Sequence, residues 1–376
     1  MRVFITGVTS FLGLYTAKLL LREGHEVIGA VRPGSRRVQE LDAHGISAYP
    51  TYRTVHLDLC ELPEAELGEA HYAEVLGFDS APLIDAWIHF AWDGVGSAGR
   101  SDTNIQIENI QNAKKAYLYA KLLGARKFLF AGSQAEYGIG NHRVPMPVSP
   151  YGKAKLSFGR WATEQSLLSE IYDDAPMQFI HMRIYSVYGS GDHETSLVNT
   201  VLRAALRHEA ITLGPCEQRW NYLEVHDLAR AIRILLSSED TRTGIYDIAG
   251  SDSRMLKKYV IAMNAIAARF SADADMTGDE EATTAAGTAH AATAGGQSTG
   301  IVAGVQTTDT ASGTATAEAP SGAELRFGTR ANNAEGAANM SPEILKLQRL
   351  GFHQEISFEA GIGMLLKTMR EEGLCL

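Results

Sequence analysis

Short apolar runs alternate with longer segments of helical spacing along the first half of the chain. The apolar runs predict strands, expected over residues 3–6, 26–31, 54–57, 85–90, 127–131 and 178–183. Apolar residues that recur every three or four positions predict helices over residues 12–22, 104–123 and 151–172. Strands that alternate with helices predict an α/β fold, a Rossmann-type doubly wound parallel sheet.

In such a sheet the carboxyl ends of the strands meet at one edge, where ligands bind. Four positions lie just after the ends of predicted strands: Gly7, Arg32, Asp58 and Ser133. We therefore expect these residues at a common ligand-binding edge.

The second half of the chain contains a segment of different composition. Residues 271–322 are rich in Ala, Thr, Gly, Ser and Asp and have no aromatic residue, so they bury too little apolar surface to offset the entropy of ordering. We interpret this segment as a disordered insertion. The expected organisation is a Rossmann domain over residues 1–188 and a smaller C-terminal substrate-binding lobe over residues 189–270 and 323–376, parts of which return to the first domain.

Charge and composition exclude several classes of function. The formal net charge of -10 and the pI of about 5.7 argue against a nucleic-acid-binding surface. No apolar run reaches the roughly 20 residues of a membrane-spanning helix. The first predicted strand begins almost at once, so we expect no signal peptide and a cytoplasmic protein. Cys60, Cys216 and Cys375 lack metal-ligand spacing and are expected to be free thiols.

A glycine turn joins the first strand to the first helix. Gly7 permits a tight turn and Gly13 permits close approach of the helix, an arrangement that holds a dinucleotide pyrophosphate. The middle position of the Gly-x-x-Gly-x-x-Gly spacing is Ser10, whose hydroxyl can bond a phosphate. The alternative is an ordinary strand-turn-helix with incidental glycines. The turn residues expected to face the cofactor are Gly7, Thr9, Ser10, Phe11, Leu12 and Gly13.

The end of the second strand indicates which dinucleotide is preferred. A carboxylate there would bind the ribose 2′-hydroxyl of NAD(H), but the chain has Arg32, followed by Arg36 and Arg37. Guanidinium groups suit a 2′-phosphate, so NADP(H) is favoured and NAD(H) remains possible. A solvated basic loop is the alternative interpretation of Arg36 and Arg37.

Tyr151 and Lys155 lie four residues apart and share one face of the predicted helix. A phenol with an ordinary pKa near 10 is a poor base at neutral pH, but a nearby ammonium group makes its phenolate accessible. The same phenol, when protonated, can donate a proton to a ketone during reduction. Ser133 ends the preceding strand, where its hydroxyl can orient the reacting oxygen. The three residues are therefore candidate catalytic groups for hydride chemistry on an alcohol or ketone.

Further along the chain, Arg219 is a candidate for bidentate binding of a substrate diphosphate, the alternative being a surface arginine before a strand. His226 and Asp227 are expected to anchor the next helix, and His89 is expected to be a core histidine. No spacing of His, Asp, Glu or Cys indicates a metal site.

Together these residues resemble the extended short-chain dehydrogenase/reductases, in the NAD(P)-dependent epimerase/dehydratase group that acts on nucleotide sugars. The resemblance covers residue 1 to about 269 and resumes from about 325 to 376. It rests on the following blocks: Thr6 to Gly13, Asp58, His89 to Ala91, Ser133 to Gly138, Tyr151 and Lys155, Arg183 to Gly189, and Arg219 to Asp227.

The resemblance implies a role for most of these positions. Tyr151 would be the acid/base, Lys155 would bind the ribose and lower the pKa of Tyr151, and Ser133 would orient the substrate. Asp58 and Leu59 would face the adenine, Asn109 would support the lysine, and Arg219 would hold the nucleotide diphosphate. Ala91 and Gln134 complete the expected cofactor and substrate contacts. The family also implies a homodimer, with residues 104–123 and 151–172 between the subunits.

The chain departs from the family pattern at two places, and the second departure bears on the expected reaction. Ser10 replaces the middle glycine, and Gln134-Ala135 occupies the place of the Asp-Glu pair that dehydratases use, with Glu136 one position off. Dehydration is therefore not expected. The expected function is NADPH-dependent reduction of a 4-keto-6-deoxy sugar nucleotide at C4. The alternatives are a nucleotide-sugar 4-epimerase with tightly bound NAD and, more remotely, a non-catalytic NADP(H) sensor.

Overall fold

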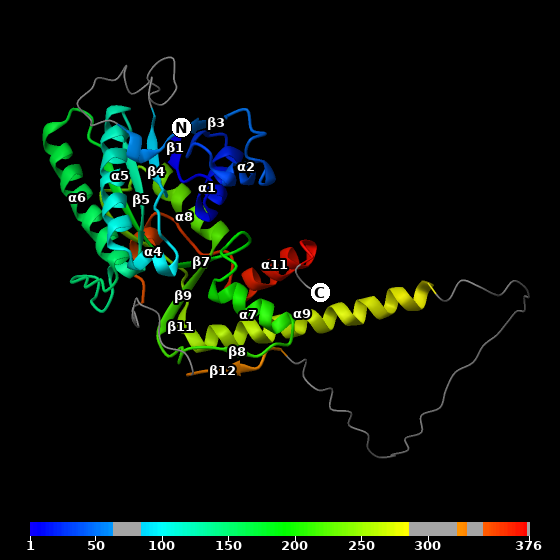
Figure 1. Ribbon diagram of the computed structural model, residues 1–376. Helices are drawn as coiled ribbons and strands as arrows, with labels where there is room; N and C mark the ends of the chain where they lie inside the picture. The colour runs from blue at the N-terminus through cyan, green and yellow to red at the C-terminus, as the bar shows by residue number, and fades with distance from the viewer. Residues whose placement is uncertain (63–83, 286–321, 329–340, 374–376) are drawn as a thin grey trace, which may run out of the picture.

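The computed structural model describes residues 1–62, 84–285, 322–328 and 341–373. These residues form a large sheet covered by helices and a smaller lobe beside it (Figure 1).

The central sheet has seven parallel strands in the order β10-β6-β5-β4-β1-β2-β3. The strands are β1 (Arg2–Thr6), β2 (Glu26–Val31), β3 (Tyr52–His56), β4 (Ala86–His89), β5 (Lys127–Ser133), β6 (Gln178–Ile184) and β10 (Gly244–Ile248). The order changes direction between β1 and β4, which is the switch point where such sheets bind ligands. The expected doubly wound sheet is confirmed. Its carboxyl edge carries the four residues expected there: Gly7, Arg32, Asp58 and Ser133.

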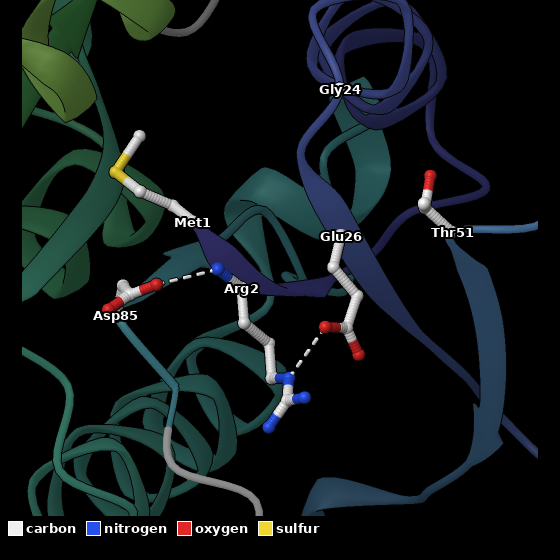
Figure 2. A pocket seen from close by; sticks show the side chains of 6 residues that line it. All are labelled: Met1, Arg2, Gly24, Glu26, Thr51 and Asp85. Carbon is white, nitrogen blue, oxygen red and sulfur yellow. Dashed lines mark hydrogen bonds and ion pairs between the residues drawn. The ribbon is translucent and has the colours of Figure 1, made fainter.

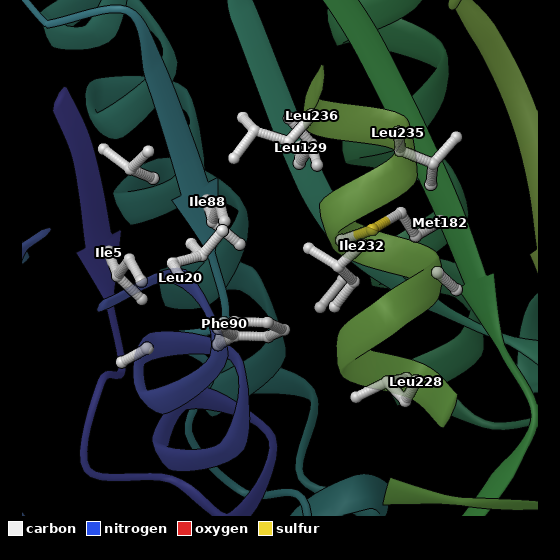
Figure 3. Close-up of a cluster of buried hydrophobic side chains, with 14 of the residues drawn as sticks. Ile5, Leu20, Ile88, Phe90, Leu129, Met182, Leu228, Ile232, Leu235 and Leu236 are labelled. Carbon is white, nitrogen blue, oxygen red and sulfur yellow. The ribbon is translucent and has the colours of Figure 1, made fainter. Parts of the chain in front are cut away.

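Two helix pairs cover the two faces of the sheet. The first pair is α1 (Phe11–Arg22) and α8 (Val225–Ser237), and the second is α5 (Thr103–Leu122) and α6 (Pro150–Tyr172). Alternate side chains of β1 point to opposite faces, so Ile5 belongs to the core under α1 and α8 while Phe4 belongs to the core under α5 and α6. Figure 3 shows the first core, where Ile5 and Leu20 lie near Ile88, and Ile232 extends from α8. Burial on both faces explains the continuous apolar runs in the sequence.

The smaller lobe has a core of its own, built mainly by α7 (Leu197–Leu206), α9 (Leu256–Ala285) and α11 (Phe358–Glu371). Its strands are β7 (Ser186–Tyr188), β9 (Arg219–Glu224) and β11 (Ser253–Met255) in one sheet, and β8 (Ile211–Thr212) with β12 (Leu325–Arg326) in another. The remaining short helices are α2 (Gln39–Ala43), α4 (Ser97–Ser101) and α10 (Leu345–Arg349), with 3₁₀ turns η1 (Arg36–Val38), η2 (Leu59–Glu61) and η3 (Gln134–Glu136).

Helix α9 corrects one expectation. The sequence predicts an unstructured segment from residue 271, but the helix continues to Ala285, so the prediction is wrong for 271–285. These residues continue a helix whose earlier part is already held by packing in the lobe, and adding residues to an existing helix avoids the cost of nucleation. Residues 286–321 of the same segment lie outside the described residues.

Candidate active site

The glycine turn lies at the switch point between β1 and β4. Gly7 has a φ of +71°, and a Cβ at this position would lie only 2.8 Å from the Ala91 nitrogen. A Cβ at Gly13 would collide with the Gly7 carbonyl oxygen. Ser10 caps α1, because its Oγ accepts a hydrogen bond from the Gly13 N–H at 3.1 Å. The turn therefore brings backbone N–H groups and the positive end of α1 to the edge where a pyrophosphate would bind.

The other residues of the turn connect it to the rest of the molecule. Thr9 precedes the cap, and Phe11 and Leu12 begin α1. The Phe11 ring lies edge-on to Tyr15, with 5.8 Å between centroids, and the Tyr15 hydroxyl donates to the Ser190 carbonyl at 3.1 Å. The loop after β7, a strand of the smaller lobe, is thus tied to the helix that carries the glycine turn.

A cation, Arg32, follows β2, and a carboxylate that caps a 3₁₀ turn, Asp58, follows β3. Arg32 has a 61% exposed side chain, and its Nη1 lies 3.0 Å from Asp93 Oδ2. Asp58 accepts a hydrogen bond from the Cys60 N–H at 3.1 Å and so begins η2, while Leu59 packs half-buried against the core under α5. Arg32 is accessible to a ligand, and Asp93 is the anion with which that ligand would compete.

Tyr151 and Lys155 lie in the first two turns of α6, beside the end of β5. Ser149 caps this helix through the Gly152 N–H at 3.1 Å. The Lys155 Nζ donates to the Ala131 carbonyl at 2.6 Å and lies 3.8 Å from the centre of the Trp92 ring and 5.6 Å from that of Tyr151. Both side chains are buried. As predicted, phenol and amine lie close together at the carboxyl edge.

Burial strongly affects the lysine. It holds the pKa of the Lys155 amine well below its usual value, and the Arg100 guanidinium acts in the same direction. The Glu136 carboxylate opposes both effects. A bound anion would restore charge to this amine.

Ser133 ends β5 and caps η3. Its Oγ accepts from the Ala135 N–H at 3.2 Å, and Glu136 Oε1 accepts from the Ser133 N–H at 2.8 Å. Glu136 is fully buried and also contacts His181 at 3.0 Å and Arg183 at 2.9 Å. Burial alone would raise the pKa of Glu136, but these partners outweigh it and lower that pKa. Glu136 is therefore a structural carboxylate that holds Ser133 in place.

Two amides on α5 hold the loop that follows β4. Asn109 accepts from the Asp93 N–H and donates to the Asp93 carbonyl, both at 2.9 Å. Gln106 accepts from Trp92 Nε1 at 2.8 Å and donates to the Gly99 carbonyl at 3.0 Å. The hydrogen bonds of Asn109 thus go to the loop rather than to the lysine, and α5 reaches the lysine through the Trp92 ring.

Sequence reasoning missed Trp92, Gln106 and Arg100. The one available signal was the presence of two amides, three residues apart, among buried positions of a helix. Such amides need partners, and here the partners belong to a loop whose conformation periodicity does not reveal.

His89 is a core residue, as expected. It is 1% exposed, and its Nδ1 lies 2.9 Å from the Thr6 hydroxyl. Burial, with a smaller effect from Lys155, lowers the pKa of His89 to about 3. The imidazole is therefore neutral near pH 7.

The candidate substrate contacts come from two elements. Gln134 donates to the Ser186 hydroxyl at 3.3 Å, which links the end of β5 to β7. Arg219 begins β9, the neighbour of β7, and its Nη2 donates to the Ser253 carbonyl at 2.9 Å. Asp227 accepts from the backbone N–H groups of Glu355 and Ile356 and so anchors α8, as expected.

A surface depression lies at the opposite edge of the sheet (Figure 2). Its lining includes Arg2 and Asp85, and Arg2 pairs with Glu26 at 2.8 Å. These residues precede or begin the strands, so the depression is remote from the carboxyl edge and carries no chemistry of the site.

Within the described residues, no group of three or more His, Cys, Asp or Glu side chains is arranged to hold a metal ion. No helix in that part of the chain is long and apolar enough to cross a membrane. Cys60 is an exposed free thiol and Cys216 a buried one, while Cys375 lies outside the described residues.

The sequence and the fold of this chain are similar to those of known proteins. The family model described as "NAD dependent epimerase/dehydratase family" matches residues 3–249. The chain is 24% identical to CDP-abequose synthase of Yersinia pseudotuberculosis over 249 residues, which covers 66% of this chain and 76% of that protein. It is 23% identical to UDP-glucose 4-epimerase of Corynebacterium glutamicum over 282 residues, 69% of this chain and 78% of the relative.

Among solved structures, MoeE5 in complex with UDP-glucose and NAD has the same fold, with a TM-score of 0.66 at 17% identity. The match covers 99% of each chain.

Proposed function

This chain belongs to the NAD dependent epimerase/dehydratase family, and we propose that it reduces a 4-keto-6-deoxy sugar nucleotide at C4 with NADPH. The observation that carries the proposal is the meeting of Ser133, Tyr151 and Lys155 at the carboxyl edge of the sheet, beside the glycine turn. An enzyme of the extended short-chain dehydrogenase/reductase type needs this combination of cofactor turn and proton donor.

The glycine turn fits a dinucleotide, because Gly7 lets the turn pack against the backbone after β4 and Gly13 lets α1 start close to the turn, as in dinucleotide-binding folds. The cofactor, when bound, supplies the hydride for C4. Ser133 would hydrogen-bond the C4 oxygen and orient it. Tyr151 would donate its proton to that oxygen as the carbonyl becomes an alcohol, and solvent would then reprotonate the phenolate. Lys155 would stabilise the phenolate and bind ribose hydroxyls.

Glu136 argues against dehydration. Water elimination needs an acid and a base beside the reacting carbons, and the place that the family pattern gives to that pair holds Gln134 and Ala135. Glu136 is committed to His181, Arg183 and the Ser133 backbone, so it cannot take up the missing role. Ketone reduction needs neither group.

Arg32 supports NADPH over NADH, because it supplies an accessible guanidinium at the end of β2, where a 2′-phosphate would lie. A reductase must release its oxidised cofactor and take up NADPH at every turnover. An exposed cofactor-binding side chain such as Arg32 suits this exchange. The similarity to CDP-abequose synthase is in line with a nucleotide-sugar substrate.

The first test is to denature purified protein and identify any released nucleotide by chromatography and mass. If the purified protein carries no nucleotide and binds NADPH more tightly than NADH, the next step is an assay of NADPH oxidation with 4-keto-6-deoxy sugar nucleotides. We expect turnover by the wild type and at least a thousandfold loss in Tyr151→Phe with cofactor binding retained.

The second candidate is a 4-epimerase, which the similarity to UDP-glucose 4-epimerase favours. Such an enzyme would retain stoichiometric NAD(H) and convert 4-epimers without added reductant, and that result would displace the reductase proposal. A protein that binds NADPH but has the same cellular phenotype after Tyr151→Phe would instead be the sensor.

A further inference from the structure

Arg100 lies over the face of the Tyr151 ring. Its guanidinium carbon is 4.7 Å from the ring centroid, whereas the Lys155 amine is 5.6 Å from the same point. The cation nearer to the candidate proton donor is therefore the arginine and not the lysine. Arg100 comes from α4, which packs against α6.

The arginine is held in this position by the loop after β4. Its Nε donates to the Val95 carbonyl at 2.6 Å, and the carbonyl of the preceding residue, Gly99, accepts from the buried Gln106 at 3.0 Å. The same amide holds Trp92, on which the Lys155 amine rests. One anchored loop thus presents a cation to Tyr151 and an aromatic face to Lys155.

The other charges near Tyr151 can be assigned element by element. Glu136 of η3 pairs with His181 and Arg183 of β6. His89 of β4 is buried and neutral near pH 7. On α5, Lys114 lies over the ring of Trp161, which is further along α6, and Lys121 pairs with Asp173, which follows the end of α6. Among the described residues, Arg100 and Lys155 are the cations whose contacts with the Tyr151 ring are established.

We propose that Arg100 is a positioning residue that stabilises the phenolate form of Tyr151 by placing a permanent positive charge over its ring. A guanidinium stays protonated in proteins, whereas burial disfavours the charged form of the Lys155 amine. A cation beside the ring attracts the phenolate more strongly than the phenol. The inference rests on the proposed function, since it assigns the chemical purpose of Tyr151.

The test is a titration of tyrosinate absorbance in the absence of substrate and cofactor. The difference between a protein and its Tyr151→Phe counterpart isolates the transition of Tyr151. We expect Arg100→Met to raise the pKa of Tyr151 by about one pH unit relative to wild type. Arg100→Lys keeps the charge and should restore most of the difference.

Arg160→Met is the matched control, because Arg160 is an exposed arginine on α6, the helix of Tyr151, and its loss changes the net charge equally. A purely structural role of Arg100 would leave the Tyr151 transition where the wild type has it, and this result would overturn the inference. If Arg100→Met does not fold, Arg100→Gln removes the charge and keeps a polar side chain. A raised pKa of Tyr151 in this variant supports the inference, and an unchanged pKa overturns it.

The titration also separates this inference from the proposed function. If Tyr151→Phe retains full reductase activity, the proposed function fails while the titration still reports on Arg100. If the reductase assay succeeds and Tyr151 titrates equally in Arg100→Met and wild type, only the inference about Arg100 fails.

Discussion

At the end of β2, the Arg32 guanidinium lies 3.0 Å from the Asp93 carboxylate, and under the proposed function this carboxylate would compete with the 2′-phosphate of NADPH for Arg32. Asp93→Asn removes the competing charge and keeps the backbone bonds to Asn109, so it should tighten NADPH binding about threefold to tenfold. Arg32→Ala should weaken NADPH binding about tenfold. Titration calorimetry with both cofactors measures these changes.

NADH is the internal control for this pair of variants, because it lacks the 2′-phosphate. Its affinity should change little in either variant. Parallel losses of NADH and NADPH in Arg32→Ala would mean that Arg32 supports the loop and does not select the cofactor.

The buried His89 predicts a pH dependence of stability. Its pKa is about 3 in the folded protein against about 6.5 in the unfolded chain, so the unfolded chain binds more protons between these values. Stability should therefore fall as the pH drops below about 6.5, by about 1.4 kcal/mol per pH unit from this residue. Denaturant unfolding at pH 7 and pH 5 should show a loss about 2 kcal/mol smaller in His89→Phe than in wild type. The exposed His56, changed to Phe, should leave the loss unaltered.

At the scale of elements, α5 acts on the site through Gln106, which is 1% exposed and bonded to Trp92 and Gly99. Gln106→Met keeps the volume but leaves the indole N–H and the carbonyl without this partner. The free energy of unfolding should fall by about 2 kcal/mol. The same change at Gln111, an exposed position on α5, should cost less than about 0.5 kcal/mol. Equal losses at both positions would mean that helix propensity and not the buried amide decides.

Elements formed by consecutive residues could be predicted from the sequence. β1, α1 and β2 follow their apolar patterns almost residue for residue, and the strand end at Ser133 and the helix start at Pro150 bring Ser133, Tyr151 and Lys155 together. Contacts across the loop after β4 could not be predicted, because Gln106 on α5 holds both Trp92 and Gly99, the residue before Arg100. For the same reason the sequence did not reveal that Asn109 forms hydrogen bonds with the backbone of Asp93 in this loop.

At the scale of the whole molecule, α8 and β10 join the Rossmann sheet although they follow the first strands of the lobe. β10 pairs with β6 and buries Ile248 in the core under α1 and α8. The lobe is thus attached to the sheet by chain segments on both sides, and Tyr15 adds a bond between α1 and the lobe loop. This double attachment ties the smaller lobe to the sheet through β10 and through α1.

The face formed by α5 and α6 predicts the assembly of the molecule. These helices pack side by side, and α6 exposes Leu167 at 50%, Ile171 at 70% and Tyr172 at 78%. Exposed apolar side chains at helical spacing favour contact with a second copy, and we propose a homodimer through this face. Light scattering after size exclusion should give twice 40.7 kDa for the wild type and 40.7 kDa for Leu167→Glu/Ile171→Glu. Ile261→Glu, a change at an exposed position on α9, should leave the mass of the wild type unaltered. A monomeric wild type at micromolar concentration would contradict the dimer.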